Sequence, residues 1–310
     1  MPCVDNNLVD KVIKLKKQKN AIILAHYYQE NDIQDCADFI GDSLALSQQA
    51  AKTNADIILF AGVLFMAETA KILNPAKKVI LPDMLAGCSL VEQCSAEALK
   101  SFKDKHPGHV LITYINCSAE VKAISDIICT SANALRVVNS VPKSTPIIFA
   151  PDKNLGKYVQ KQSGRELILW DGSCEVHTTF DLVKILKIKE QNPDAKIIAH
   201  PECSENILDV AHHIGSTTSL IEYTKSSSAT NFIVATEPGV IYQMKKLSPQ
   251  KTFIPAPAES GESCNVCPHM RLNTMQKIYD CLINESPEIT IPESIRKLAY
   301  LPIEKMLALG

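Results

Sequence analysis

Short apolar runs recur along the chain at nearly constant spacing, and each breaks into more polar residues. Three of them are residues 21–25, 110–113 and 196–199. The positions that follow these runs are 88 and 86 residues apart, at His26, Tyr114 and His200. Repetition at a fixed interval is typical of a structural unit that occurs several times in one chain. The pattern therefore predicts three copies of one unit.

A helix-start signal follows each of these runs. The segments Gly41-Asp42-Ser43, Thr130-Ser131-Ala132-Asn133 and Gly215-Ser216-Thr217-Thr218 each open a stretch with helical apolar periodicity, and Ser43, Ser131 and Thr217 in them are again 88 and 86 residues apart. Serine, threonine and aspartate are good helix N-caps because their side-chain oxygen accepts a hydrogen bond from a free backbone N–H group. Each copy is therefore predicted to contain a helix that starts at this segment.

Two further apolar runs complete each copy. They are residues 56–60 and 79–82 in the first copy, 146–150 and 167–170 in the second, and 231–235 and 252–255 in the third. Each copy is thus predicted as strand, helix, strand, helix, strand. Short all-apolar strands that alternate with helices indicate parallel sheets covered on both faces.

The predicted fold class is α/β, with three pseudo-threefold-related αβα three-layer domains that contain short parallel sheets. We assign residues 6–92, 93–180 and 181–275 to the three repeats and residues 276–310 to a C-terminal helical tail. Ligands of parallel α/β sheets bind at the carboxyl ends of the strands. Three such units facing one another would surround a central active-site cleft.

The last strand of each copy leads to a cysteine. Cys88 and Cys174 are 86 residues apart, and Cys267 follows after another 93. We expect the three thiols to meet at a shared centre. Three thiolate ligands hold a soft metal or an iron–sulfur cluster and leave one position open for substrate. The alternative is that Cys264 and Cys267 form a local Cys-x-x-Cys redox pair or half of a zinc site.

Composition narrows the functional classes. The net charge is −2 and no stretch is strongly basic, so nucleic-acid binding is not expected. No apolar run reaches the roughly 18 residues that a membrane span needs, and the start has no signal-peptide pattern, so a cytoplasmic protein is expected. Eleven cysteines in such a protein argue against a disulfide framework. Four are predicted as core residues, namely Cys36, Cys117, Cys129 and Cys281.

The strand-end residues indicate acid–base chemistry on an anion. Hydroxyl and backbone N–H groups at helix starts bind anions, and the candidates are Ser43, Ser131, Ser216 and Thr217. The candidates for moving protons are His26, Tyr28, His200 and Glu202. Beside an open metal site, these groups suit a small anionic substrate that undergoes proton transfers and loses water.

Several motifs together resemble the quinolinate synthase family. They are Ala25-His26-Tyr27-Tyr28-Gln29, Gly41-Asp42-Ser43, Tyr114-Ile115-Asn116, His200-Pro201-Glu202-Cys203, Gly215-Ser216-Thr217 and Cys267-Pro268-His269-Met270. The resemblance spans nearly the whole chain in the same order. It implies three pseudo-threefold-related domains, and a [4Fe-4S] cluster whose open iron acts as a Lewis acid. The implied reaction condenses iminoaspartate with dihydroxyacetone phosphate to quinolinate, phosphate and water in NAD biosynthesis. A functional link to an L-aspartate-oxidising enzyme is also implied.

The resemblance also implies residue roles. The cluster ligands would be Cys88, Cys174 and Cys267; the family ligand precedes Pro-x-Met, which selects Cys267, whereas spacing alone slightly favours Cys264. The catalytic group would comprise Tyr28, Glu202, His26 and His200. The substrate pocket would contain His26, Ser43, Tyr114, Asn116, Ser131, His177, His200, Glu202, Ser216 and Thr217. Thr218 and Ala235 depart from the family pattern, where serine and glycine are expected, and neither change removes a proposed ligand.

Two other functional classes remain open at this point. One is a non-catalytic iron–sulfur redox protein, which needs no substrate pocket. The other is a zinc-dependent hydrolase that uses His26, His200 and Glu202 as metal ligands.

Overall fold

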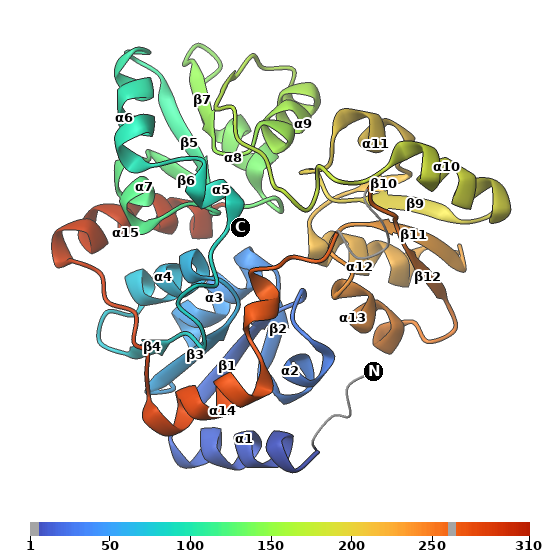
Figure 1. Ribbon diagram of the computed structural model, residues 1–310. Coiled ribbons are helices and arrows are strands. Elements are labelled where there is room, and N and C mark those ends of the chain that lie inside the picture. Colours follow the sequence, from blue (N-terminus) through green and yellow to red (C-terminus); the bar gives the residue numbers. More distant parts are fainter. Residues whose placement is uncertain (1–5, 260–264) are drawn as a thin grey trace.

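Three α/β units surround a common centre (Figure 1). The structure is a computed structural model that describes residues 6–259 and 265–310. Each unit holds one sheet of four parallel strands, and helices cover both faces of the sheets. The predicted class, three αβα units with short parallel sheets, is confirmed.

The first unit alternates strands and helices. A leading helix, α1 (Asn6–Gln18), precedes the sheet. The strands are β1 (Ala21–His26), β2 (Phe39–Gly41), β3 (Ile57–Ala61) and β4 (Lys78–Ile80). The connecting helices are α2 (Asn31–Cys36), α3 (Ser43–Lys52) and α4 (Leu64–Leu73). The strand order is β2-β1-β3-β4.

The second and third units repeat this connectivity. The second sheet has the order β6-β5-β7-β8, and the third has the order β10-β9-β11-β12. The second unit comprises α6 (Ala96–Asp104), β5 (Val110–Tyr114), α7 (Ala119–Ile124), β6 (Ile127–Cys129), α8 (Ala134–Ser140), β7 (Ile147–Ala150), α9 (Lys153–Ser163) and β8 (Ile168–Leu169). The third comprises α10 (Leu182–Gln191), β9 (Lys196–Ala199), α11 (Glu205–Val210), β10 (His213–Ile214), α12 (Thr217–Ser226), β11 (Asn231–Ala235), α13 (Val240–Leu247) and β12 (Thr252–Pro255).

Each unit contains one strand and two helices more than the sequence predicts, since a helix (α1, α6 or α10) also precedes its first strand. The prediction of three strands per copy is wrong because β2, β6 and β10 are isolated runs of two or three residues. The equally short β4 and β8 overlap the longer apolar runs 79–82 and 167–170, which made them recognisable. The other additional helices, α2, α7 and α11, have six residues each and fill the interval before β2, β6 and β10.

Apolar strands build the core, as their sequence requires. All five residues of β3 are buried, and the largest core cluster contains Phe60, Phe149 and Phe232 from the three different sheets. The apolar contacts therefore run through all three units. Burial of continuous apolar strands on both faces is the expected result of parallel βαβ connections.

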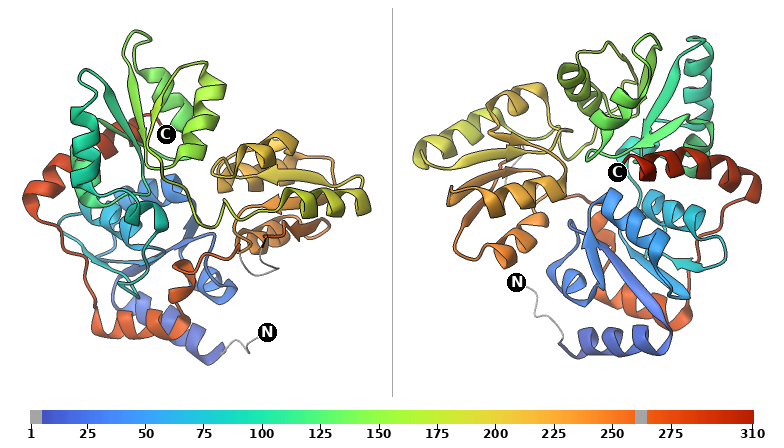
Figure 2. Two further views of the ribbon diagram at one scale, coloured as in Figure 1. Left: turned by 45° about the horizontal axis from the view of Figure 1, so that its top comes forward. Right: turned by 180° about the vertical axis from the view of Figure 1, so that it is seen from behind.

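The C-terminal tail ties two units together (Figure 2). Helix α14 (Met275–Asn284) packs on α1, and α15 (Glu293–Ala308) packs on α7 and β6 of the second unit and on α4 of the first. The inward face of α15 is fully buried at Ala299, Ile303 and Met306. The sequence predicted a helical tail without indicating where it packs.

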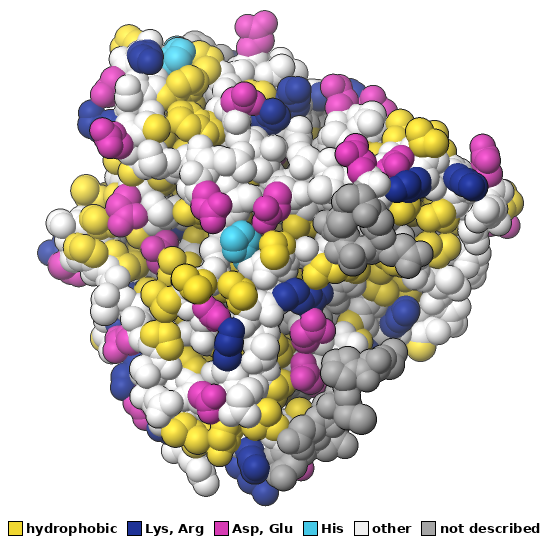
Figure 3. All heavy atoms as spheres, viewed as in Figure 1, with side chains coloured by type: hydrophobic (Ala, Val, Ile, Leu, Met, Phe, Trp, Pro, Cys, Tyr) yellow, Lys and Arg dark blue, Asp and Glu magenta, His cyan; other side chains and the backbone are white. Residues whose placement is uncertain are grey.

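The surface has a mixed character. On the face seen in Figure 3, side chains of both charge signs are interspersed with apolar ones. Within the part of the chain that the structure describes, no helix combines the length and apolar content that crossing a membrane requires.

Candidate functional site

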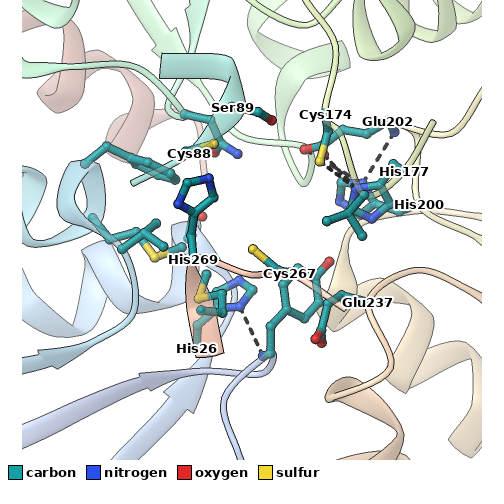
Figure 4. Close-up of a pocket in the computed structure, with 18 of the residues that line it drawn as sticks. His26, Cys88, Ser89, Cys174, His177, His200, Glu202, Glu237, Cys267 and His269 are labelled. Carbon is teal, nitrogen blue, oxygen red and sulfur yellow. Dashed lines mark hydrogen bonds and ion pairs between the residues drawn. The ribbon is translucent and has the colours of Figure 1, made fainter. Parts of the chain in front are cut away.

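A central cavity lies where the carboxyl ends of the strands converge (Figure 4). About 690 Å³ of space that protein atoms do not fill lies here, part of it open to solvent, and residues of all three units line it. Of the predicted site residues, the lining includes His26, Tyr28, Ser43, Cys88, Tyr114, Asn116, Ser131, Cys174, His177, His200, Glu202, Thr217 and Cys267. The structure thus brings together almost every residue that the sequence singled out.

His26 stands at the end of β1, where the strand delivers its side chain to the cavity. The side chain is buried, and Nδ1 accepts a hydrogen bond from the backbone N–H of Tyr28 at 3.2 Å. Burial lowers the pKa of His26 to about 4, against a smaller opposing effect of Asp42. His26 is therefore neutral at pH 7 and its free nitrogen, Nε2, is left to bind a substrate.

The hydroxyl of Tyr28 reaches residues of the third unit. Its oxygen lies 3.1 Å from Thr217 Oγ1 and 2.8 Å from Thr236 Oγ1. Burial raises the pKa of Tyr28 well above its usual value, although the two threonine hydroxyls act against this shift. Tyr28 thus stays protonated and is able to donate a proton.

Glu202 is the most heavily engaged acid of the cavity. Tyr114 Oη donates to its Oε1 at 2.5 Å, and His177 Nδ1 lies 2.9 Å from its Oε2. Burial acts to raise the pKa of Glu202, but His177, His200 and the Tyr114 hydroxyl bring it below its usual value. Glu202 is therefore an ionised carboxylate in a buried setting.

His200 and Asn116 complete the polar lining. His200 Nε2 lies 3.1 Å from Ser131 Oγ, and burial lowers the pKa of His200 to about 3. The buried Oδ1 of Asn116 has no hydrogen-bond partner among the described residues. A buried polar atom without a partner is costly, so Asn116 is positioned for a ligand that enters the cavity.

The three predicted thiols lie around the same cavity. Cys88 precedes the short helix α5 (Ser89–Glu92), Cys174 follows β8, and Cys267 precedes the 3₁₀ turn η1 (Met270–Leu272). Burial raises the pKa of Cys267 to about 11, and the pKa values of Cys88 and Cys174 are raised further. Three half-buried thiols that line one cavity need a cation to stabilise them as thiolates. This donor set fits a soft metal or an iron–sulfur cluster.

The remaining cysteines of the described residues lie apart from this set. Cys36, Cys117, Cys129 and Cys281 are buried core residues, which confirms that prediction. Cys264 lies outside the described residues.

Asp42, Glu175 and Glu237 line the cavity and escaped the sequence prediction. So did Asp152, which lies beside Cys174 without lining the cavity. Asp152 is fully buried, caps α9 and accepts from the backbone N–H of Cys174 at 3.2 Å. Glu237 is also fully buried, and its Oε1 lies 2.7 Å from the Arg271 guanidinium. Burial raises the pKa of Glu237 to about 7, although Arg271 opposes the shift. Asp152 and Glu237 closely follow β7 and β11. A polar residue just after a strand was the pattern that identified the other site residues, so the same pattern could have identified these two.

Ser216 differs from its prediction. Its hydroxyl donates to Asp42 Oδ2 at 3.0 Å and accepts from the backbone N–H of Ser219, so it caps α12. Both hydrogen bonds join protein groups, and Ser216 is not among the residues that line the cavity. The neighbouring Thr217, in contrast, lines it.

One group with metal-ligand spacing exists among the described residues, and it differs from the zinc set suggested by the sequence. It comprises Cys174, His177 and Glu202, whose ligand atoms lie within 4.8 Å of one another. His177 Nδ1 already contacts both other members directly, at 3.2 Å from Cys174 Sγ and 2.9 Å from Glu202. Direct contacts therefore account for the close spacing.

Comparison with known proteins gives a consistent result. The model of a family described as quinolinate synthetase A protein matches residues 10–308. Proteins named quinolinate synthase from Gloeothece citriformis and Rippkaea orientalis are 58% and 60% identical over 309 and 307 residues. These alignments cover 100% and 99% of this chain and 96% and 94% of the relatives. The quinolinate synthase of Cyanophora paradoxa is 60% identical over 303 residues, or 98% of this chain and 92% of that protein.

Proposed function

The chain belongs to the quinolinate synthetase A family of enzymes, and on this basis we propose that it condenses iminoaspartate with dihydroxyacetone phosphate to quinolinate. Phosphate and water are the other products, and quinolinate serves NAD biosynthesis. One observation carries the proposal. A single cavity collects three cysteines from three chain segments together with buried acid–base residues of all three units.

Cys88, Cys174 and Cys267 would hold a [4Fe-4S] cluster. Three protein ligands leave one iron open, and when bound such a cluster supplies a Lewis acid that favours loss of a substrate hydroxyl. Burial raises the pKa of the three thiols, so each would need the positive charge of the cluster iron to ionise and bind it. Asp152 would help to orient Cys174 as a ligand, since its carboxylate accepts a hydrogen bond from the backbone N–H of Cys174.

Hydroxyl groups opposite the cysteines would bind the substrate carboxylates. Ser43 and Thr217 are the first residues of α3 and α12, where backbone N–H groups and the helix dipole favour anions. The capping positions themselves are taken by Asp42 and Ser216, which leaves the hydroxyls of Ser43 and Thr217 free of that task. Ser131 adds a third hydroxyl beside His200.

Glu202 and Tyr28 would move the protons. Glu202 is ionised and buried, so it is a base that gains strength when a substrate displaces water around it. Tyr28 is protonated and acts as the acid. His26 and His200 are neutral at pH 7, and each offers a ring nitrogen to the substrate in that state.

Supply of the substrate gives a further part of the proposal. Iminoaspartate hydrolyses readily, so an L-aspartate-oxidising enzyme in the same compartment, which we propose is the cytoplasm, would have to provide it.

The two rival functions are disfavoured by the same cavity. A plain electron carrier needs no buried substrate groups, and His26 and His200 are not in the one described group with metal-ligand spacing.

The direct test is product formation. Anaerobically purified protein, mixed with dihydroxyacetone phosphate and freshly generated iminoaspartate, is expected to form quinolinate, measured by liquid chromatography. No product from protein with a full cluster would refute the proposed reaction. A protein whose activity follows zinc content, with no iron or sulfide, would instead support the hydrolase.

Tyr28→Phe tests the role of the acid. Removing a general acid typically slows turnover by 10²- to 10⁴-fold, so we expect kcat to fall by roughly 100-fold or more. Iron and sulfide content should stay equal to those of the wild type, because the ring still packs against His26 at 4.3 Å between centroids. Wild-type kcat in a cluster-replete Tyr28→Phe protein would exclude Tyr28 from proton transfer.

A further inference from the structure

Thr236 connects two residues of the site without touching the cavity itself. It follows β11 in the third unit and is fully buried. Its Oγ1 lies 2.8 Å from the hydroxyl of Tyr28 and 2.9 Å from Nε2 of His177. Tyr28 belongs to the first unit and His177 follows the last strand of the second. One hydroxyl thus joins side chains of all three units.

Both ring nitrogens of His177 have partners. Nδ1 lies 2.9 Å from Oε2 of Glu202 and 3.2 Å from Sγ of Cys174, and Nε2 faces Thr236. A hydroxyl group both donates and accepts, so Thr236 is able to hold the Tyr28 hydroxyl and His177 Nε2 at the same time. The contacts therefore run from Tyr28 through Thr236 and His177 to Glu202.

We propose that Thr236 is a positioning residue that fixes the orientations of the Tyr28 hydroxyl and of the His177 ring. This inference rests on the proposed function, in which Tyr28 is the acid and Glu202 the base. Thr236 is not part of the cavity lining, so it acts only through these partners. Thr217 supplies a second contact to the same hydroxyl, at 3.1 Å, but it reaches no nitrogen of His177 in the described contacts.

The position also explains why a threonine is needed rather than an apolar residue of the same shape. Valine would leave His177 Nε2 facing a methyl group in a buried place. A buried polar atom without a hydrogen-bond partner is costly, so the imidazole is expected to turn or to admit a water molecule. Serine keeps the hydroxyl and therefore both hydrogen bonds.

Kinetics of two variants test the proposal. Thr236→Val should lower kcat roughly 10- to 100-fold, in the range expected when catalytic groups are misplaced, with KM changed by less than about threefold. Thr236→Ser should restore kcat to within about threefold of the wild type. Thr224→Val is the matched control, because Thr224 is equally buried and its hydroxyl bonds only the carbonyl of Ile221. Wild-type kcat in Thr236→Val would overturn the proposal.

A double variant separates positioning from a general structural effect. If Thr236 acts through Tyr28 and His177, its replacement by valine should cost less in a Tyr28→Phe background than in the wild type. Equal losses in both backgrounds would show that Thr236 does not act through Tyr28, and would overturn that half of the proposal.

Crystal structures of the valine and serine variants provide a readout that is independent of activity. Serine should keep both contacts, whereas valine should show a rotated His177 ring or a new water molecule at Nε2. Unchanged rings without a new polar partner would overturn the proposal. If the wild type forms no quinolinate, the proposed function fails, and these structures still decide whether Thr236 positions its partners.

Discussion

At the scale of single residues, burial decides the protonation states of the site. His26 and His200 are kept neutral, and Tyr28 is kept protonated, because the cavity is screened from water. Glu202 is the exception, since three polar neighbours offset its burial. The site thus holds an ionised base and a neutral acid, which are the two states that a proton transfer requires.

His26 gives a testable pH dependence. Its pKa is lowered from 6.5 to about 4, so the unfolded state binds a proton between these values that the folded state does not. Stability from this group is present above pH 6.5 and is lost as the pH falls towards 4. Between pH 6.5 and 5 the loss amounts to about 2 kcal/mol. Urea unfolding at pH 7 and pH 5 should therefore show a smaller loss in His26→Gln than in the wild type.

The control for this measurement is His109→Gln, since His109 is only partly buried and does not line the cavity. Its loss of stability between the two pH values should match that of the wild type. An equal loss in His26→Gln would contradict the burial of a neutral His26 in the folded protein.

Most of the site residues could be predicted because their place next to an apolar run is visible in the sequence. Others could not, because their importance depends on contacts with distant segments of the chain. His26 and His200 directly end or follow apolar runs, where a polar residue stands out. Asp152 and Thr236 also follow strands, but as residue types common in turns. Their importance comes from Cys174, Tyr28 and His177, which belong to other segments and reach them only in the folded chain.

At the scale of elements, the first, third and fourth strands of each unit were predictable because each overlaps a continuous apolar run. The second strands, β2, β6 and β10, were not, since they gain their place by pairing with a neighbour. The caps of α3 and α12, Asp42 and Ser216, lie inside the segments where helix starts were predicted. Which residue of each segment is the cap has a functional consequence, because it leaves Ser43 and Thr217 free of the capping task.

Helix α15 offers a test of how an element contributes to stability. Ile303 is fully buried on the side facing the second unit, while Leu301 on the same helix is 56% exposed. Ile303→Ala should lower the free energy of unfolding by about 2–5 kcal/mol, and Leu301→Ala by less than about 0.5 kcal/mol. Chemical denaturation measures both. Similar losses in the two variants would show that α15 does not pack as described.

At the scale of the whole molecule, triplication explains how distant residues come to share one cavity. Each unit turns the carboxyl ends of its strands inward, and the segments after the last strands of the first two units and the one before η1 each bring a cysteine. Regular spacing predicted the repetition. The packing site of the tail was not predictable from the sequence. The apolar face of α15 could pack on any apolar surface, and which surface is available depends on how the three units are arranged.

The convergence of the three thiols is the central claim, and metal analysis of cysteine variants tests it most directly. Anaerobically reconstituted wild type should contain about four iron and four sulfide ions per chain, as one cubane requires. Cys88→Ala, Cys174→Ala and Cys267→Ala should each lose most of this content together with activity, while Cys117→Ala, which removes a buried core thiol, should retain it. A full complement of iron and sulfide in any of the first three variants would contradict the shared centre.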